Sequence, residues 1–232
     1  MALSGRVLPY IGAAAGLVLV AGFYLALFYA PPDYQQGETV RMMFVHVPSA
    51  TLATQGYTVL AAASAIVLIW RHPLADVCAQ AAAPIGAAFT FLALLTGALW
   101  GKPMWGAWWV WDARLTSVLV QFLLYLGYMA LRATIDDPQR GQKAGAILAL
   151  VGFINVPIIR YSVDWWNTLH QPASLIRADG PAIHPDILLP LLVMMVGFGL
   201  FYVTVLLIRM RAEILRQRVR VLRLARADQV SG

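Results

Sequence analysis

The chain has 232 residues, of which 60% are hydrophobic and only 12% are charged, with a formal net charge of +6. This apolar content and the scarcity of charge exclude the class of soluble globular proteins. The charged residues are also segregated, and they leave long uncharged windows of the kind that membrane-spanning helices require.

Six uncharged windows predict an all-α integral membrane protein, a bundle of six transmembrane helices. The fifth window is short, but Lys143 and Arg160 at its ends extend its reach by snorkelling. Residues 1–208 form the predicted transmembrane domain and residues 209–232 a basic C-terminal tail. The tail is expected to lie on anionic lipid as an amphipathic helix or to dock a cytoplasmic partner. The predicted spans are about 8–30, 49–70, 79–100, 114–132, 144–160 and 187–208.

The distribution of basic residues predicts the orientation of the bundle. With the N-terminus inside, the inner segments hold twelve of the seventeen Lys and Arg residues and the outer segments hold five. We therefore expect both termini in the cytoplasm and the connection between the third and fourth helices outside. In a bacterium this places the chain in the inner membrane as a multi-pass protein, with that connection in the periplasm.

Residues 100–114, WGKPMWGAWWVWDAR, form a tryptophan-rich loop between the third and fourth predicted helices. Gly101, Pro103 and Gly106 are expected to interrupt any plain helix through it. If residues 105–112 form a short surface helix, then helical spacing puts four side chains on one face. These four are Trp105, Trp108, Trp109 and Asp112.

Asp112 has two interpretations that are compatible with each other. An aspartate directly before an apolar run is a favoured N-cap, here for the fourth membrane helix. The carboxylate is alternatively expected to orient a ligand or to pair with Arg114.

The tryptophans fall mainly on the predicted outer side. Trp70 lies at the inner boundary, whereas an aromatic belt would decorate both interfaces. The one-sided distribution favours a functional outer surface that offers flat apolar faces to a flat cofactor. The seven outer tryptophans are Trp100, Trp105, Trp108, Trp109, Trp111, Trp165 and Trp166.

Two of the four histidines are flanked by aromatic residues on the predicted outer side. His46 lies where the first outer loop enters the second helix, and His170 lies in the third outer loop. Imidazole is a preferred axial ligand of haem iron, and haem suits a wall of indoles. A zinc site is less attractive because the outer loops offer no tight ligand cluster. His72 is expected to be a solvated turn residue, and His184 receives no ligand role.

Haem carries two propionates, for which basic residues are the natural partners. The predicted outer face offers several basic residues. Each of them has the alternative role of anchoring the protein at the membrane interface. They are Arg41, Lys102, Arg114, Arg160 and Arg177.

The loop WGKPMWGAWWVWDAR resembles the "WWD" signature of haem-handling membrane proteins. The segments MFVHVP around His46 and WWNTLHQ around His170 resemble the two external histidine segments of one branch, the haem exporter protein C (CcmC) family of bacterial cytochrome c maturation. The similarity covers essentially the whole chain. Two other WWD branches, a synthetase subunit of the same system and a protein of the other assembly system, are longer.

The resemblance implies that haem b, bound in transit, is held between the tryptophan-rich loop and His46 and His170 as axial ligands. It implies delivery to a periplasmic haem chaperone (CcmE type), whose own histidine captures a haem vinyl group. It also implies a complex with a small single-span subunit (CcmD type) and an ABC-type ATPase pair (CcmA and CcmB type). The chain would then be a binding and transfer component, with any part in forming the covalent bond left open. Membrane lipids are its other expected contact, and nucleic acid is not an expected partner.

Two other functions compete with haem binding and transfer. One is transport of haem through the helix bundle itself. No uncharged window contains a buried charge pair and nothing indicates paired broken helices, which disfavours this function. The other is a b-type cytochrome that exchanges electrons with quinone, which would place its ligating histidines inside the helices rather than at their ends.

Overall fold

The computed structural model of the protein describes residues 2–171, 174–175 and 177–231. Helices make up most of this part, and its only β-type pairing is an isolated bridge between Asp33 and Gly37. In chain order the elements are α1 (Ala2–Tyr24), the π-helical turn η1 (Leu25–Tyr29), the 3-10 turn η2 (Glu38–Met42), α2 (Met43–Trp70), α3 (Pro73–Trp105), α4 (Ala113–Thr134), α5 (Pro138–Gly152), α6 (Asn155–Trp165) and α7 (Pro185–Ser231).

Six helical segments of the described residues are long and apolar enough to cross a membrane. They confirm the predicted all-α membrane bundle of six spans, and most of them extend beyond the predicted ends. The segments are Ser4–Tyr29, Glu38–Trp70, Pro73–Trp105, Ala113–Thr134, Pro138–Trp165 and Pro185–Arg223.

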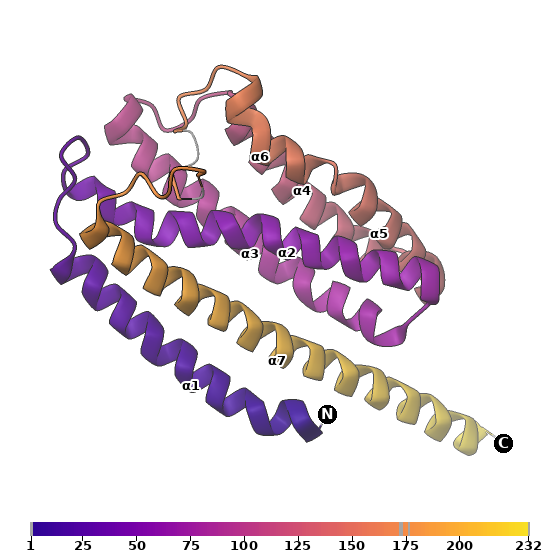
Figure 1. Cartoon of the computed structure of the whole chain (residues 1–232). Helices are drawn as coiled ribbons and strands as arrows, with labels where there is room; N and C mark the ends of the chain where they lie inside the picture. The colour runs from indigo at the N-terminus through magenta and orange to yellow at the C-terminus, as the bar shows by residue number, and fades with distance from the viewer. Residues whose placement is uncertain (1, 172–173, 176, 232) are drawn as a thin grey trace.

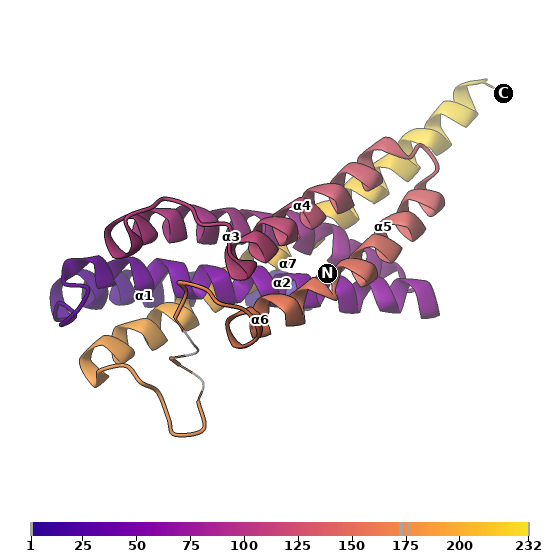
Figure 2. The ribbon, with the colours of Figure 1, turned by 90° about the horizontal axis from the view of Figure 1, so that it is seen from above.

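The helices pack chiefly as sequence neighbours, except that the first and last lie together. Figure 1 shows α1 beside α7, and α2 packs most extensively against α3. The α3–α4 connection (106–112) and the α6–α7 connection (166–184) lie at the same end of the bundle, which we call the tryptophan-rich end (Figure 1). Both chain termini lie away from it. The Arg-rich residues from 209 onward continue α7 as one helix, which extends past the rest of the bundle in both views (Figures 1 and 2).

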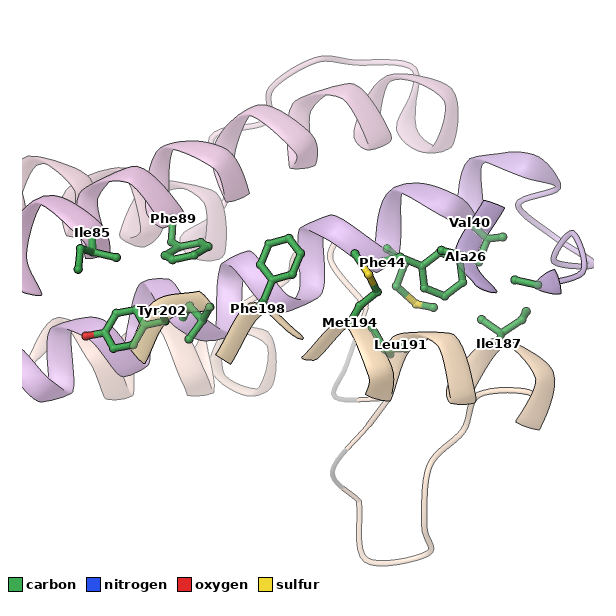
Figure 3. Close-up of a cluster of buried hydrophobic side chains, with 13 residues drawn as sticks. Ala26, Val40, Phe44, Ile85, Phe89, Ile187, Leu191, Met194, Phe198 and Tyr202 are labelled. Carbon is green, nitrogen blue, oxygen red and sulfur yellow. The ribbon is translucent and has the colours of Figure 1, made fainter. Parts of the chain in front are cut away.

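The largest buried cluster joins α7 to α2 and α3, as Figure 3 shows. Leu191 and Met194 of α7 are fully buried in it. Phe89 of α3 packs against the rings of Phe198 and Tyr202, with centroids 6.0 and 6.4 Å apart. Burial of such side chains fixes the start of α7, and with it the end of the connection that carries His170.

The fifth span differs from the single helix predicted for 144–160, because it consists of two helices, α5 and α6. The break falls at Phe153 and Ile154, directly before the buried Asn155. The Asn155 amide donates to the carbonyl oxygen of Ser117, at 2.9 Å, and to Oε1 of Gln121, at 3.2 Å. A buried amide requires such partners, so the break serves to turn Asn155 toward α4.

The expected interruption of the helix at Gly101 and Pro103 is wrong, because α3 continues through both to Trp105. Gly106 ends it in the left-handed conformation, with φ of 76°, and its N–H donates to the carbonyl oxygen of Lys102. Glycine is the residue that adopts this C-terminal cap at low cost. The conditional short helix over 105–112 is also absent, since the described residues 106–112 are non-helical.

Candidate functional site

His46 lies in the first turn of α2, and its ring is held against α3. Its Nδ1 atom is 3.1 Å from the Thr96 hydroxyl oxygen, and the Trp100 ring meets it edge-on with centroids 5.6 Å apart. A Cβ atom at Gly97 would stand 3.1 Å from Cε1 of the imidazole. Gly97 thus allows the imidazole to approach the α3 backbone closely. His46 was expected where the first outer loop enters the second helix, and the helix begins at Met43, earlier than the predicted start of the span at residue 49.

His170 lies in the α6–α7 connection and faces the end of α3. Its Nδ1 atom is 3.1 Å from the carbonyl oxygen of Gln171, and its ring centroid is 6.3 Å from that of Trp105. Because a carbonyl only accepts, Nδ1 carries the proton and Nε2 keeps a free lone pair. Burial, and secondarily the positive charge of Arg114, hold the pKa of His170 below its ordinary value. The neutral, ligating form is therefore favoured.

The structure brings His46 and His170 together although they are far apart in the sequence. The two imidazoles are near enough to interact electrostatically, and the charge of Arg114 acts on both. The Arg114 side chain is itself fixed by the α6 region. Its Nε donates to the Ser162 hydroxyl at 2.9 Å and its Nη2 to the carbonyl oxygen of Arg160 at 3.3 Å.

Asp112 performs the capping role and also contacts the second connection. Its Oδ1 accepts a hydrogen bond from the backbone N–H of Leu115, at 2.7 Å, which caps α4. Its Oδ2 accepts a hydrogen bond from the Thr168 hydroxyl. That hydroxyl oxygen in turn accepts from the backbone N–H of His170, at 3.1 Å. The carboxylate therefore helps to hold the loop that carries His170.

Some tryptophans of the loop are fixed by contacts within the chain, and others are exposed. Trp100 donates from Nε1 to the Gln36 side chain at 3.0 Å, and Trp105 folds back over Gly101. Trp108 and Trp111 are 55% and 75% exposed.

The remaining indoles lie near other aromatic rings. The ring centroids of Trp109 and Trp111 are 5.4 Å apart, and Nε1 of Trp109 is buried without a hydrogen-bond partner among the described residues. Trp165 and Trp166 are exposed neighbours, and Trp165 stacks on Tyr161 at 5.5 Å. The tryptophan-rich end thus presents several indole faces to its surroundings.

The four other candidate propionate partners already have contacts of their own, and the Arg160 guanidinium lies 5.6 Å from the Tyr161 ring centroid. Arg41 bonds to Glu38 at 2.6 Å and to the Ala26 carbonyl oxygen. The Lys102 ammonium donates to the carbonyl oxygen of the glycine that caps α3 and lies 5.9 Å from the Trp108 ring centroid. Arg177 lies 4.0 Å from an exposed aspartate in its own loop. Arg114, whose charge reaches both histidines, is the strongest candidate.

The two remaining histidines occupy capping positions. His184 directly precedes α7, where its Nδ1 atom accepts from the backbone N–H of Asp186 at 3.3 Å. His72 precedes α3 and is exposed at the opposite end of the bundle. The exposure of His72 agrees with its expected place in a solvated turn.

Comparison with known proteins matches the sequence along its whole length. The sequence model of the family described as CcmC, "Heme exporter protein C", matches residues 1–225. A protein named "Heme exporter protein C" from Bradyrhizobium diazoefficiens is 58% identical over all of this chain and 88% of its own length. Proteins of the same name from Escherichia coli strain K12 and Haemophilus influenzae are 46% and 45% identical, over 91% and 92% of this chain and 85% and 87% of their own lengths.

The chain belongs to the heme exporter protein C family. In this member of the family, sequence reasoning missed the polar side chains that hold the two histidines. Thr96 lies one helical turn before Trp100, and Thr168 lies two residues before His170. The i, i+4 spacing of Thr96 and Trp100 is a signal for a shared helix face. Gln36 carried no such signal, because its contact with Trp100 spans 64 positions.

The residues at this end fit haem as a cargo of this family member. They offer two imidazoles, several indole faces and a fixed guanidinium. Axial imidazoles suit haem iron, aromatic faces suit the porphyrin, and guanidinium pairs well with carboxylates. In the described part of the chain, no cluster of three or more His, Cys, Asp or Glu side chains is placed to hold a bare metal ion.

Proposed function

We propose that the chain holds haem at the tryptophan-rich end and passes it on for cytochrome c maturation, with His46 and His170 as axial ligands. The proposal is carried by the position of these two histidines against the C-terminal end of α3, where His46 contacts Trp100 and His170 lies beside Trp105. Membership of a family named for haem export supports the choice of cargo. Haem b is the expected form, because the chain has no Cys-x-x-Cys-His motif for covalent attachment.

Each part of the site has a distinct role in this proposal. The imidazoles of His46 and His170 would hold the haem iron as its ligands. Trp100 and Trp105 lie edge-on or tilted beside them and would contact the porphyrin. The Arg114 guanidinium, fixed by α6, pairs with a propionate.

The exposed tryptophans form the surface where a partner takes over the cargo. Trp108, Trp111, Trp165 and Trp166 are each more than half exposed. Exposed aromatic side chains in a cluster are typical of interaction sites. We propose that a periplasmic haem chaperone of the CcmE type docks on them, and that this chain positions the haem for it.

The orientation and the other partners follow from the same proposal. The tryptophan-rich end lies opposite both termini, and the excess of basic residues at the terminal end supports a periplasmic location for it. The CcmA, CcmB and CcmD type subunits would complete the complex in the bacterial inner membrane. The Arg-rich extension of α7 is expected to contact anionic lipid on the cytoplasmic side.

Two features of the structure bear on the alternative of haem transport through the bundle. Arg132 and Asp76 form a largely buried ion pair, with an N–O distance of 3.1 Å, between α3 and α4. The fifth span is also broken. Both features have structural partners: Gln80 donates to Asp76 at 2.8 Å, and Asn155 at the break bonds to α4. They therefore brace helices rather than mark a route for haem.

The proposed function is tested by following haem from this chain to the chaperone. The purified chain should bind haem with the spectrum of a six-coordinate iron, and adding purified chaperone should deplete it of haem. Vesicles that contain only this chain should not move haem across the bilayer. Haem transport by such vesicles, or a chain that binds no haem, would contradict the proposal.

A further inference from the structure

The hydroxyl group of Thr96 lies between the backbone of α3 and the ring of His46. Its oxygen is 2.7 Å from the carbonyl oxygen of Leu92 and 3.1 Å from Nδ1 of His46. The side chain is buried, so water does not compete readily for these contacts. A serine or threonine in a helix commonly bonds in this way to the carbonyl four residues before it.

Counting protons assigns the direction of the contact between Thr96 and His46. A hydroxyl has one hydrogen, and the shorter contact to the Leu92 carbonyl oxygen uses it, because a carbonyl only accepts. The Thr96 oxygen is then an acceptor toward His46. A neutral imidazole has one N–H, so its proton sits on Nδ1 and Nε2 keeps a lone pair.

We propose that Thr96 is a positioning residue that fixes His46 in the Nδ1–H form, so that Nε2 is presented to haem iron. This inference rests on the proposed function, in which His46 is an axial ligand. The ring is also confined sideways, by the close approach at Gly97 and by the edge of Trp100. The Thr96 hydroxyl, the backbone at Gly97 and the Trp100 ring together restrict the orientation of the ligating nitrogen.

His170 reaches the same state by a different route, since its Nδ1 donates to a backbone carbonyl. The two histidines would therefore present equivalent Nε2 atoms, although only one depends on a side chain. The dependence makes His46 the ligand that a single substitution can disturb.

A hydrogen bond from Nδ1–H makes the imidazole a stronger electron donor to its metal. Loss of such an outer partner typically costs about tenfold or more in metal affinity. We therefore expect Thr96→Val, which keeps the shape but removes the hydroxyl, to weaken haem binding about tenfold. The midpoint potential of the bound haem should rise, because a weaker donor stabilises the ferric iron less. Thr96→Ser should restore both values toward those of the unchanged chain.

The experiment compares four variants of the full chain, measuring haem dissociation and midpoint potential. The matched control is Thr90→Val, because Thr90 is buried in the same helix and its hydroxyl bonds only to the Gly86 carbonyl oxygen among the described residues. Thr90→Val should leave both readouts unchanged, and His46→Ala should lose one axial ligand.

The outcomes separate this inference from the proposed function. If His46→Ala loses haem while Thr96→Val keeps the original dissociation rate and potential, the positioning role is wrong and haem ligation stands. An effect of Thr96→Val that Thr96→Ser shares, or that Thr90→Val equals, also overturns the positioning role. If His46→Ala leaves haem binding and spectrum unchanged, the proposed ligation itself is wrong.

Discussion

The Asp112 carboxylate accepts a hydrogen bond from the Thr168 hydroxyl and joins two connections whose bonded residues are 56 positions apart. The same carboxylate caps α4, and the same hydroxyl accepts from the backbone of His170. The aspartate of the tryptophan-rich loop is thus connected to a proposed haem ligand through one threonine. Its contribution is to position the loop that carries His170.

Replacing Thr168 with valine should release this loop while leaving the α4 cap intact. We expect Thr168→Val to lower haem affinity about tenfold, by analogy with the loss of other outer partners of ligands, without lowering the amount of protein. Thr134→Val is the matched control, since its hydroxyl bonds to the carbonyl oxygen of Ala130 at the other end of α4. Equal haem titrations for the two variants would show that the link to Asp112 does not matter.

The exposed tryptophans should be replaceable without loss of the fold. Trp108 and Trp111 are both more than half exposed, so Trp108→Ala with Trp111→Ala should leave protein abundance unchanged. Aromatic contacts contribute about 0.5–1.5 kcal/mol each, so haem binding or transfer should fall about tenfold. Trp70→Ala is the control, because Trp70 is 68% exposed at the opposite end. Reduced abundance with a normal ratio of haem to protein would favour an aromatic belt instead.

The ion pair between Asp76 and Arg132 should stabilise the fold without touching the site. Removing one partner of a buried pair costs about 3 kcal/mol or more, because the other charge remains buried. We expect Asp76→Asn to lower the unfolding temperature in detergent and Arg132→Met, added to it, to restore most of the loss. A double variant that unfolds as early as the single one would show that the uncompensated charge is not the cause.

The orientation of the bundle can be tested with single cysteines in a Cys78→Ser background. Gln35 lies in the connection before α2, at the tryptophan-rich end, whereas Gln139 begins α5 at the other end, and both are exposed. An impermeant thiol reagent added to intact spheroplasts should label Gln35→Cys and spare Gln139→Cys. The reverse pattern would invert the whole assignment.

Sequence patterns predicted the spans well because burial in lipid demands long apolar stretches whatever the packing. The predictions were wrong at positions where the local sequence does not decide whether a helix continues. Pro103 did not end α3, since a helix tolerates the loss of a single hydrogen bond near its C-terminus. The break before Asn155 exists for contacts with α4 that lie more than thirty positions away, which no local pattern contains.

Sequence reasoning singled out the two histidines of the candidate site but not the groups that hold them. Aromatic neighbours singled out His46 and His170, and the structure brings the two together. Thr96 and Thr168 remained invisible because threonine is common in membrane helices and loops. Only the fold shows that their hydroxyl groups face these histidines.

The most direct test of haem ligation is the absorption spectrum and haem content of the purified chain with His46→Ala and His170→Ala combined. The account predicts that each single variant retains less haem, with an altered coordination spectrum, and that the double variant retains almost none. His72→Ala, at the opposite end of the bundle, should match the unchanged chain. A double variant with normal haem content and an unchanged six-coordinate spectrum would contradict the account.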